Sequence, residues 1–308
     1  MEEIIRWYNI SWTSRTDGPG LRAVLFLSQC HLRCPWCHAP HSRKRDGGLL
    51  FFEDRCLGCR ACETVCPNGV HEFRNGTHRV DRTACRGCGM CLGACPTVAS
   101  RESLTGALAL PKFQATVPEL FDKMQPQLEL LKRLGGITVS GGEPLLQYRA
   151  VESLLSLCKN AGYHTAVETS GFVPWERMEP LVDLVDCWLF GFRPVRRETM
   201  EIPGLPDVPM VRETLERLAS ETPGQIIIRT PVIPGYTDDP VIYSFIARVM
   251  RANHLDEIQL MPFNPYSDLY YRAMGKSFPL SDQENIPPEF MESTRDYLAK
   301  QGLRACIT

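Results

Sequence analysis

The residues best suited to chemistry in this sequence are its cysteines. The 308-residue chain has 14 cysteines, and eleven of them lie between Cys30 and Cys95. Short, regular cysteine spacings in a chain without signs of secretion indicate metal binding rather than disulfides. The other three, Cys158, Cys187 and Cys306, stand alone among apolar neighbours. We expect those three to be inert core residues, because isolated cysteine is among the most buried residue types.

The first cysteine group is Cys30, Cys34 and Cys37, with the spacing C-x3-C-x2-C. A fully ligated [4Fe–4S] cluster takes four thiolates, so three ligands would leave one iron open to a substrate. A structural zinc site completed by His38 or by a remote ligand is an alternative that the spacing alone leaves open. Trp36 lies between two of these cysteines. We expect its ring to form a flat apolar wall beside the open iron, although a simple core position is also compatible with the sequence.

The remaining eight cysteines form two runs of the pattern C-x2-C-x2-C-x3-C-P. This run is typical of two-cluster bacterial ferredoxins, in which the fourth cysteine of each run serves the other cluster. The predicted ligand sets are Cys56, Cys59, Cys62 and Cys95 for one cluster, and Cys85, Cys88, Cys91 and Cys66 for the other. Electron transfer is the expected role of these two clusters. A purely structural staple or a docking module is the alternative.

Composition limits the class of protein. Hydrophobic residues make up 44% and charged residues 23% of the chain, and the formal net charge is −2. Without a basic excess, nothing favours nucleic-acid binding. No apolar run approaches the roughly 20 residues needed to cross a bilayer, and the N-terminus is acidic where a signal peptide is positive. We therefore expect a cytoplasmic protein that binds neither nucleic acids nor membranes.

Six apolar segments, each followed by helical sequence, are expected to position the cysteines. The expected strands are 21–27, 137–140, 164–168, 187–190, 226–232 and 257–261, and the expected helices are 118–134, 144–161, 174–185, 211–220, 240–253 and 288–301. Pro126 is expected to kink or break the first helix. Repeated strand–helix units predict a parallel sheet covered by helices. Six units are too few for a closed eight-stranded barrel, so we expect an open, partial barrel with its site at the carboxyl ends of the strands.

The same reading divides the chain into three segments. Residues 1–48 contain the first strand and the first cysteine group, and residues 101–308 contain the other strand–helix units. Residues 49–100 hold eight cysteines and show little helical periodicity. So small a segment needs a staple, and we expect metal rather than an apolar core to hold this insert together.

The first cysteine segment, C-x3-C-x-W-C-H preceded by Asp17-Gly18-Pro19-Gly20, resembles the radical S-adenosylmethionine (SAM) superfamily. More narrowly, it resembles the activating enzymes of glycyl radical enzymes, such as the pyruvate formate-lyase activating enzyme. The resemblance spans nearly the whole chain, and subgroups of that family carry a ferredoxin insert at this position. It implies an α/β fold, a partial (β/α)6 TIM-like barrel with an inserted two-cluster ferredoxin-like domain.

The resemblance also implies the cofactors and the reaction. Three [4Fe–4S] clusters and SAM are expected, with SAM chelating the open iron through its amino and carboxylate groups. One electron would cleave SAM to methionine and a 5′-deoxyadenosyl radical, which abstracts a hydrogen atom. In an activating enzyme, that hydrogen comes from a glycine Cα of a partner enzyme. A flavodoxin or ferredoxin would supply the electron, under anaerobic conditions.

Several side chains match family positions that contact SAM. Gly141, Gly142 and Glu143 resemble the GGE motif for the SAM amino group, and Arg229 resembles the arginine that contacts SAM. The alternative for Arg229 is an ion pair at the surface. The expected SAM-binding residues are Trp36, Gly141, Gly142, Glu143, Glu168, Thr169, Arg193, Arg229 and Asn264.

The chain departs from the family pattern at four positions. Glu168 stands where the family usually has Asp, and Asn264 stands where it usually has His. Gly191 and Arg193 replace the Asp and Lys of a D-x-K motif. Gly191 cannot supply the carboxylate of the monovalent cation site that some members have. Arg193 keeps the positive charge with a wider planar fork, and we expect it to replace that cation in part.

These observations rank three functions. An activating enzyme leads, with the partner loop entering the barrel near Asp17–Gly20, Phe192 and Arg193. A radical SAM enzyme acting on a small molecule or peptide, without a glycyl radical partner, stays open because of the altered Gly191, Arg193 and Asn264. An electron carrier ranks lowest, because it leaves the first cysteine group and the GGE turn unexplained. Apart from the zinc alternative at His38, the sequence assigns no ligand role to any of the seven histidines, and we expect His38 to lie beside the cluster ligands rather than among them.

Overall fold

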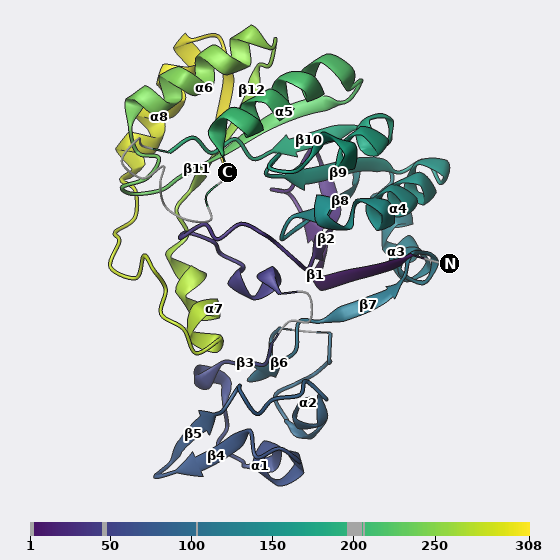
Figure 1. The fold of residues 1–308 in the computed structure, drawn as a ribbon, viewed down its shortest axis with the longest axis vertical. Helices are drawn as coiled ribbons and strands as arrows, with labels where there is room; N and C mark the ends of the chain where they lie inside the picture. The colour runs from purple at the N-terminus through teal and green to yellow at the C-terminus, as the bar shows by residue number, and fades with distance from the viewer. Residues whose placement is uncertain (1–2, 45–47, 103, 196–204, 206) are drawn as a thin grey trace.

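The computed structural model describes residues 3–44, 48–102, 104–195, 205 and 207–308 (Figure 1). It has a mixed α/β fold around an open nine-stranded sheet of order β13-β12-β11-β10-β9-β8-β2-β1-β7. The strands from β2 to β13 in this order are parallel, whereas β1 and β7 are antiparallel additions at one edge. The strand bounds are β1 Ile4–Ser14, β2 Leu21–Leu27, β7 Phe113–Thr116, β8 Gly135–Gly141, β9 His164–Thr169, β10 Cys187–Phe190, β11 Gln225–Val232, β12 Glu257–Pro262 and β13 Arg304–Ile307.

All six predicted strands are confirmed, as β2, β8, β9, β10, β11 and β12. Sequence patterns did not predict β1, β7 and β13. Most residues of each of these strands are exposed or half-buried, although Ile5, Trp7 and Tyr8 of β1 are buried. They therefore lack the continuous apolar run that marks a fully buried parallel strand.

Five helices of thirteen or more residues accompany the sheet, and two predictions were wrong, a break at Pro126 and one helix over residues 174–185. The five are α3 Val117–Leu131, α4 Tyr148–Asn160, α5 Val208–Glu221, α6 Pro240–Ala252 and α8 Pro288–Lys300. α3 runs unbroken across Pro126. Pro126 is on the exposed face of the helix, whereas Leu120, Met124 and Leu128 are on the buried face. The segment 174–185 forms two short 3-10 stretches, Trp175–Arg177 and Glu179–Leu184, instead of one α-helix. The second stretch begins around Pro180, which cannot donate the i→i−4 bond of a continuous helix.

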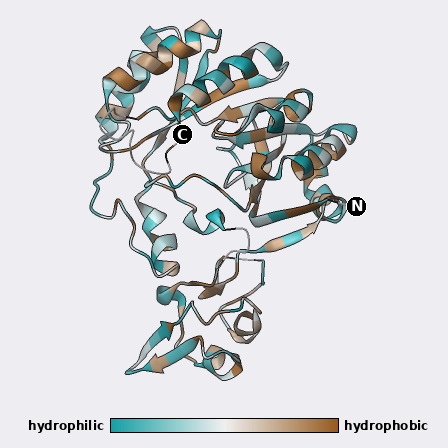
Figure 2. Cartoon of the chain, viewed as in Figure 1, coloured by the Kyte–Doolittle hydropathy of each residue, from teal (hydrophilic) through white to brown (hydrophobic). Residues whose placement is uncertain are grey.

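The main apolar core lies between the sheet and its helices, and both the strands and the helices contribute apolar residues to it (Figure 2). All four residues of β10 are buried. Cys158 is fully buried in the main core and Cys187 is fully buried in a smaller apolar cluster with Ala166, Leu189 and Ile227, as predicted, but Cys306 is exposed. Cys306 lies on the edge strand β13, which has only one neighbour in the sheet. Among the described residues, no helix combines the length and apolarity that a membrane crossing requires.

Residues 49–110 form a separate cysteine-rich segment at the foot of the molecule in Figure 1. It contains β3 (Leu50–Phe51) paired with β6 (Leu108–Ala109), the hairpin β4 (His71–Arg74) and β5 (Thr77–Val80), and the short helices α1 (Ala61–Val65) and α2 (Met90–Ala94). α1 and α2 each follow a left-handed residue, Arg60 and Gly89, at the same place in the two cysteine runs. The doubled sequence pattern is therefore a doubled local structure.

Candidate functional site

The three cysteines of the first group line one cavity of about 200 Å³. Strands β2, β8, β9, β11 and β12 reach this cavity at their carboxyl ends, as expected for parallel strand–helix units. The predicted residues in its lining are Cys30, Cys34, Trp36, Cys37, Gly141, Gly142, Glu168, Thr169, Arg193, Arg229 and Asn264. Of the predicted SAM contacts, only Glu143 is outside the lining. The fold therefore gathers residues from nearly the whole chain into one place.

Backbone hydrogen bonds hold the GGE turn against the start of the cysteine loop. Gln29 has a left-handed backbone (φ 81°), which ends β2 and turns the chain into the loop. The N–H of Gly142 donates to the Leu27 carbonyl at 2.8 Å, and the N–H of Glu143 donates to the Gln29 carbonyl at 2.8 Å. A Cβ at Gly142 would lie 2.0 Å from the Gln29 oxygen, so a side chain has no room there. Close backbone approach thus explains the second glycine of the motif.

The Glu143 side chain links the carboxyl ends of β8 and β9. It is 1% exposed. Its Oε1 accepts from the Leu145 N–H at 3.2 Å and the Thr169 hydroxyl at 2.8 Å. Its Oε2 accepts from the Ser170 N–H at 2.9 Å and the Ser170 hydroxyl at 2.6 Å. Both carboxylate oxygens accept hydrogen bonds from the protein itself, so Glu143 positions Thr169 and Ser170 at the end of β9.

Glu168 and Arg229 form an ion pair inside the cavity. Arg229 NH1 lies 2.8 Å from Glu168 Oε1, and the Ser140 hydroxyl donates to Glu168 Oε2 at 2.6 Å. Burial by itself would raise the pKa of Glu168, but Arg229 and Ser140 hold that pKa below its usual range. The carboxylate is therefore ionised at neutral pH. The alternative prediction for Arg229, a surface ion pair, is correct only in part. The ion pair exists, but it is buried.

Arg193 occupies the space beside Gly191. A Cβ at Gly191 would lie 3.0 Å and 3.2 Å from two guanidinium nitrogens of Arg193. Burial alone would lower the pKa of Arg193, but the negative charges of Cys34 and Glu168 raise it. The two departures from the family pattern are therefore spatially coupled, since the glycine leaves room for the folded-back guanidinium. Arg193 Nε and Arg229 Nε are buried without a hydrogen-bond partner among the described residues.

The spread of the first cysteine group suits a cluster of several metal ions better than one ion. Four ligands around a single zinc ion, with Zn–S near 2.3 Å, place their sulfurs about 3.8 Å apart. Among the described residues, Cys30, Cys34, Cys37 and His38 do not offer any three ligand atoms within 4.8 Å of one another. Burial, followed by Glu143, raises the pKa of Cys30 to about 12, so metal binding there must displace a proton.

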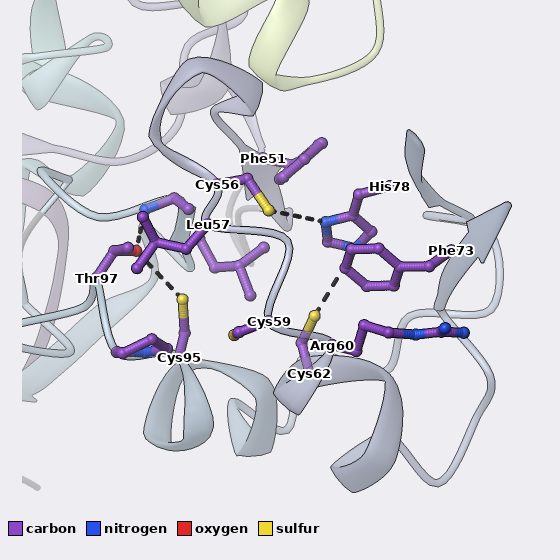
Figure 3. A pocket seen from close by; sticks show the side chains of 13 residues that line it. Phe51, Cys56, Leu57, Cys59, Arg60, Cys62, Phe73, His78, Cys95 and Thr97 are labelled. Carbon is purple, nitrogen blue, oxygen red and sulfur yellow. Dashed lines mark hydrogen bonds between the residues drawn. The ribbon is translucent and has the colours of Figure 1, made fainter. Parts of the chain in front are cut away.

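The eight remaining cysteines line two further cavities in the predicted sets. One cavity is lined by Cys56, Cys59, Cys62 and Cys95 (Figure 3), and the other by Cys66, Cys85, Cys88 and Cys91. The last cysteine of each run therefore faces the cavity of the other run. The donor set in each cavity, four cysteines, is the one that a [4Fe–4S] cluster takes.

Sequence reasoning missed two buried histidines that connect these cavities. His78 Nδ1 lies 3.5 Å from Cys56 Sγ, and His78 Nε2 lies 3.8 Å from Cys62 Sγ (Figure 3). His71 Nδ1 lies 3.0 Å from His78 Nε2, and His71 lines the other cavity. Burial lowers the pKa of both imidazoles, that of His71 to about 4. These histidines could have been found from the sequence, because side chains alternate between the two faces of a strand. In the β4–β5 hairpin this alternation places His71, Phe73 and His78 on one face.

Three family models match the sequence. The radical SAM superfamily matches residues 95–245, a 4Fe-4S dicluster domain matches residues 48–96, and a 4Fe-4S single cluster domain matches residues 16–55. The last two matches contain the proposed cluster cysteines of the cysteine-rich segment and of the first group, respectively.

Curated relatives match along most of their length. The chain is 33% identical over 283 residues to the isethionate sulfite-lyase activating enzyme of Oleidesulfovibrio alaskensis, covering 89% of this chain and 88% of that protein. It is 31% identical over 307 residues to the 4-hydroxyphenylacetate decarboxylase activating enzyme of Clostridioides difficile, covering 97% and 94%. It is 28% identical over 313 residues to the indoleacetate decarboxylase activating enzyme of Tractidigestivibacter scatoligenes, covering 97% and 96%.

Proposed function

Because this chain belongs to the radical SAM enzymes that activate glycyl radical enzymes, we propose how its residues carry out that activity. With its cofactors bound, it reductively cleaves SAM to a 5′-deoxyadenosyl radical that abstracts a glycine Cα hydrogen atom of a partner enzyme. The observation that carries the residue assignment is the single cavity on which three thiols, the GGE turn and the buried Glu168–Arg229 pair meet.

Cys30, Cys34 and Cys37 would hold a [4Fe–4S] cluster, which would bind SAM and supply the electron that cleaves it. The loop that carries them starts at a fixed point, because Gln29 is tied to Ser42 and to the GGE turn. Trp36 is 8% exposed, and its ring packs edge-on against Tyr236 with ring centroids 5.2 Å apart. It forms the apolar wall of the cavity and excludes water from the reacting atoms.

Side chains around the cavity hold SAM by charge and shape. Gly141 and Gly142 allow close backbone approach, while Thr169 and Asn264 line the cavity. Arg193 and Arg229 each keep a buried donor nitrogen that an anionic group of a ligand can satisfy. Glu143 acts as a positioning residue, since its carboxylate braces Thr169 and Ser170.

In this proposal, Arg193 takes the place of a monovalent cation beside Glu168 in part. Its guanidinium lies where the side chain of residue 191 would otherwise be. We expect SAM affinity, measured by isothermal titration on the reconstituted protein, to stay the same when Na⁺ is exchanged for K⁺ or choline. The variant Arg193→Lys combined with Gly191→Asp should acquire a dependence on the cation. A Na⁺ or K⁺ ion bound beside SAM in the unaltered protein would contradict this role.

The cysteine-rich segment carries electrons to the first cluster. In this proposal, residues 1–48 and 101–308 form a partial (β/α)6 barrel, and residues 49–100 form a two-cluster ferredoxin-like insert, to which β6 of the following stretch is joined by pairing with β3. Support comes from the two four-cysteine cavities and from the dicluster match over residues 48–96. The protein then carries three [4Fe–4S] clusters in all, with a flavodoxin or ferredoxin as electron donor.

The deciding experiment is electron paramagnetic resonance after reduced protein, SAM and a glycyl radical enzyme encoded beside this gene are mixed. We expect a glycyl radical doublet that is abolished by Cys34→Ala and kept by the control Cys306→Ala, whose thiol is exposed and outside every cluster cavity. SAM cleavage without a doublet, in the presence of a matched partner, would instead support a radical SAM enzyme for a small molecule or peptide.

A further inference from the structure

An open cavity of about 530 Å³ lies where the cysteine-rich segment meets the rest of the protein, and its charged lining is basic. Lys44, Arg82, Arg86, Lys112 and Lys276 line it, and no acidic side chain does so among the described residues. The whole chain has a formal net charge of −2. Five basic side chains on one cavity are therefore a local concentration of positive charge, which we call the basic groove.

Among the described residues, four of the five basic side chains of the groove make no polar contact that would stabilise the fold. Lys44, Arg86, Lys112 and Lys276 are exposed, and within the described part of the chain none of them forms an ion pair or a side-chain hydrogen bond. Arg82 differs, because it donates to the carbonyls of Leu49 at 3.2 Å and Ala273 at 2.7 Å. It thereby fixes the cysteine-rich segment to α7 (Asp268–Ala273) and holds the two walls of the groove together.

The groove shares a wall with one of the four-cysteine cavities. Leu49, Cys85, Arg86, Gly87 and Leu110 line both. The Lys112 ammonium lies 2.6 Å from the point where a Cβ on Gly87 would be, so its charge rests against the cysteine loop. A protein seated in the groove would therefore contact the loop that carries Cys85 directly.

We propose that the basic groove is the docking surface for an acidic one-electron donor protein, which delivers its electron at the centre held by Cys66, Cys85, Cys88 and Cys91. This rests on the proposed function of those cysteines. The donor is oxidised by one electron and the centre is reduced by one, with no bond formed or broken. Complementary charge steers such encounters and fixes their orientation.

The glycyl radical enzyme is the other protein that could occupy the groove, and the structure favours a separate place for it. Its glycine must reach the cavity of Cys30, Cys34 and Cys37. That cavity and the basic groove share no lining residue.

The test uses full-length reconstituted protein and a purified acidic flavodoxin as the probe. Lys112→Glu and Lys276→Glu reverse charge in the groove outside the cysteine runs. Lys300→Glu is the matched control, exposed on α8, far from the cysteine-rich segment in Figure 1. We expect each groove variant to weaken flavodoxin binding and slow stopped-flow reduction by about tenfold or more at low salt. Added NaCl should remove the difference from the unaltered protein, and the control should match that protein throughout.

Equal binding and equal reduction rates for groove variants and control would overturn the inference. So would groove variants that reduce normally with flavodoxin but fail to activate the partner enzyme with dithionite, since the groove would then bind that enzyme. The proposed function is checked separately. It fails if the unaltered protein binds no iron in the cysteine-rich segment and does not cleave SAM when dithionite is the reductant. If the groove variants still cleave SAM with dithionite, their defect lies in docking of the electron donor.

Discussion

At the scale of single residues, Glu143 shows how a motif residue can act through the scaffold. Each carboxylate oxygen accepts one backbone N–H, from Leu145 on one side and Ser170 on the other. An ionised carboxylate accepts at both oxygens, whereas an amide must turn its NH₂ toward one of these donors. The site therefore requires a carboxylate rather than any polar side chain of the same shape.

Glu143→Gln should accordingly destabilise the protein by about 1–3 kcal/mol, because one buried N–H faces another donor. SAM affinity should fall as well, since the ends of β8 and β9 lose their link. Chemical denaturation and isothermal titration measure the two effects. Glu176→Gln, at an exposed position, is the matched control. An unchanged unfolding free energy for Glu143→Gln would show that the link is dispensable.

His78 is the second residue whose role depends on neighbours distant in sequence. A neutral His78 donates from Nδ1 to Cys56 when its Nε2 accepts from His71. Hydrogen bonds to cluster sulfurs raise the reduction potential by stabilising the more negative, reduced state. The His71–His78 pair should therefore give the proposed cluster at Cys56 a higher reduction potential than it would have without this hydrogen bond.

His78→Phe should lower the potential of the cluster on Cys56, Cys59, Cys62 and Cys95, as followed by redox titration with paramagnetic resonance detection. The ring volume is roughly kept, so iron and sulfide content should not change. The cluster on Cys30, Cys34 and Cys37 serves as an internal control. A potential that does not move would assign His78 a packing role only.

At the scale of elements, β2 carries a buried charge that organises the amino-terminal end of the sheet. Arg22 is 0% exposed within an otherwise apolar strand. Its guanidinium donates to the Ile137 carbonyl at 2.5 Å, the Thr138 hydroxyl at 2.7 Å and the Pro19 carbonyl at 3.0 Å. Burial lowers the pKa of Arg22 to about 10, which still leaves it charged at neutral pH. One side chain thus ties β2, β8 and the turn before β2 together.

Arg22→Leu should lower the free energy of unfolding by about 2–4 kcal/mol, because several buried acceptors lose their donor. Urea denaturation followed by circular dichroism measures this change. Arg248→Leu, on the exposed face of α6, should change stability by less than about 0.5 kcal/mol. Equal effects of the two substitutions would mean that water replaces the lost hydrogen bonds of Arg22.

At the scale of the whole molecule, the cysteine-rich segment and the nine-stranded sheet depend on different forces. The sheet and its helices share one large apolar core, whereas the segment has a small cluster of apolar residues interleaved with cysteines. A unit this small rarely folds on apolar burial alone. Metal binding then contributes directly to the folding free energy of the segment.

Removing iron with a chelator should therefore unfold the cysteine-rich segment selectively. Hydrogen exchange followed by mass spectrometry should show peptides from α1, α2 and the β4–β5 hairpin exchanging at least about tenfold faster in the metal-free protein. Peptides from α4 and α6 should keep their protection, since both helices pack on the main core. Uniform loss of protection across the chain would mean that the two parts fold as one cooperative unit.

The cysteine groups, the six parallel strands and the family resemblance could all be predicted from the order of residues. Spacing along the chain controls these features, because ligands a few residues apart and apolar runs a few residues long are local properties. Local sequence patterns gave wrong predictions at two places, a helix break at Pro126 and a single helix over residues 174–185. Whether a proline is tolerated depends on which face of the helix is exposed, and that is decided by packing.

Apart from the crossed cysteine sets, contacts between side chains distant in sequence could be seen only in the folded protein. The Glu143 contacts with Ser170, the Arg193 guanidinium beside Gly191 and the His78 contact with Cys56 each depend on how loops fold against one another. The basic groove combines side chains from four separate stretches of the chain. Strand register, strand order and loop packing set such distances, and none of these is carried by the spacing of residues along the chain.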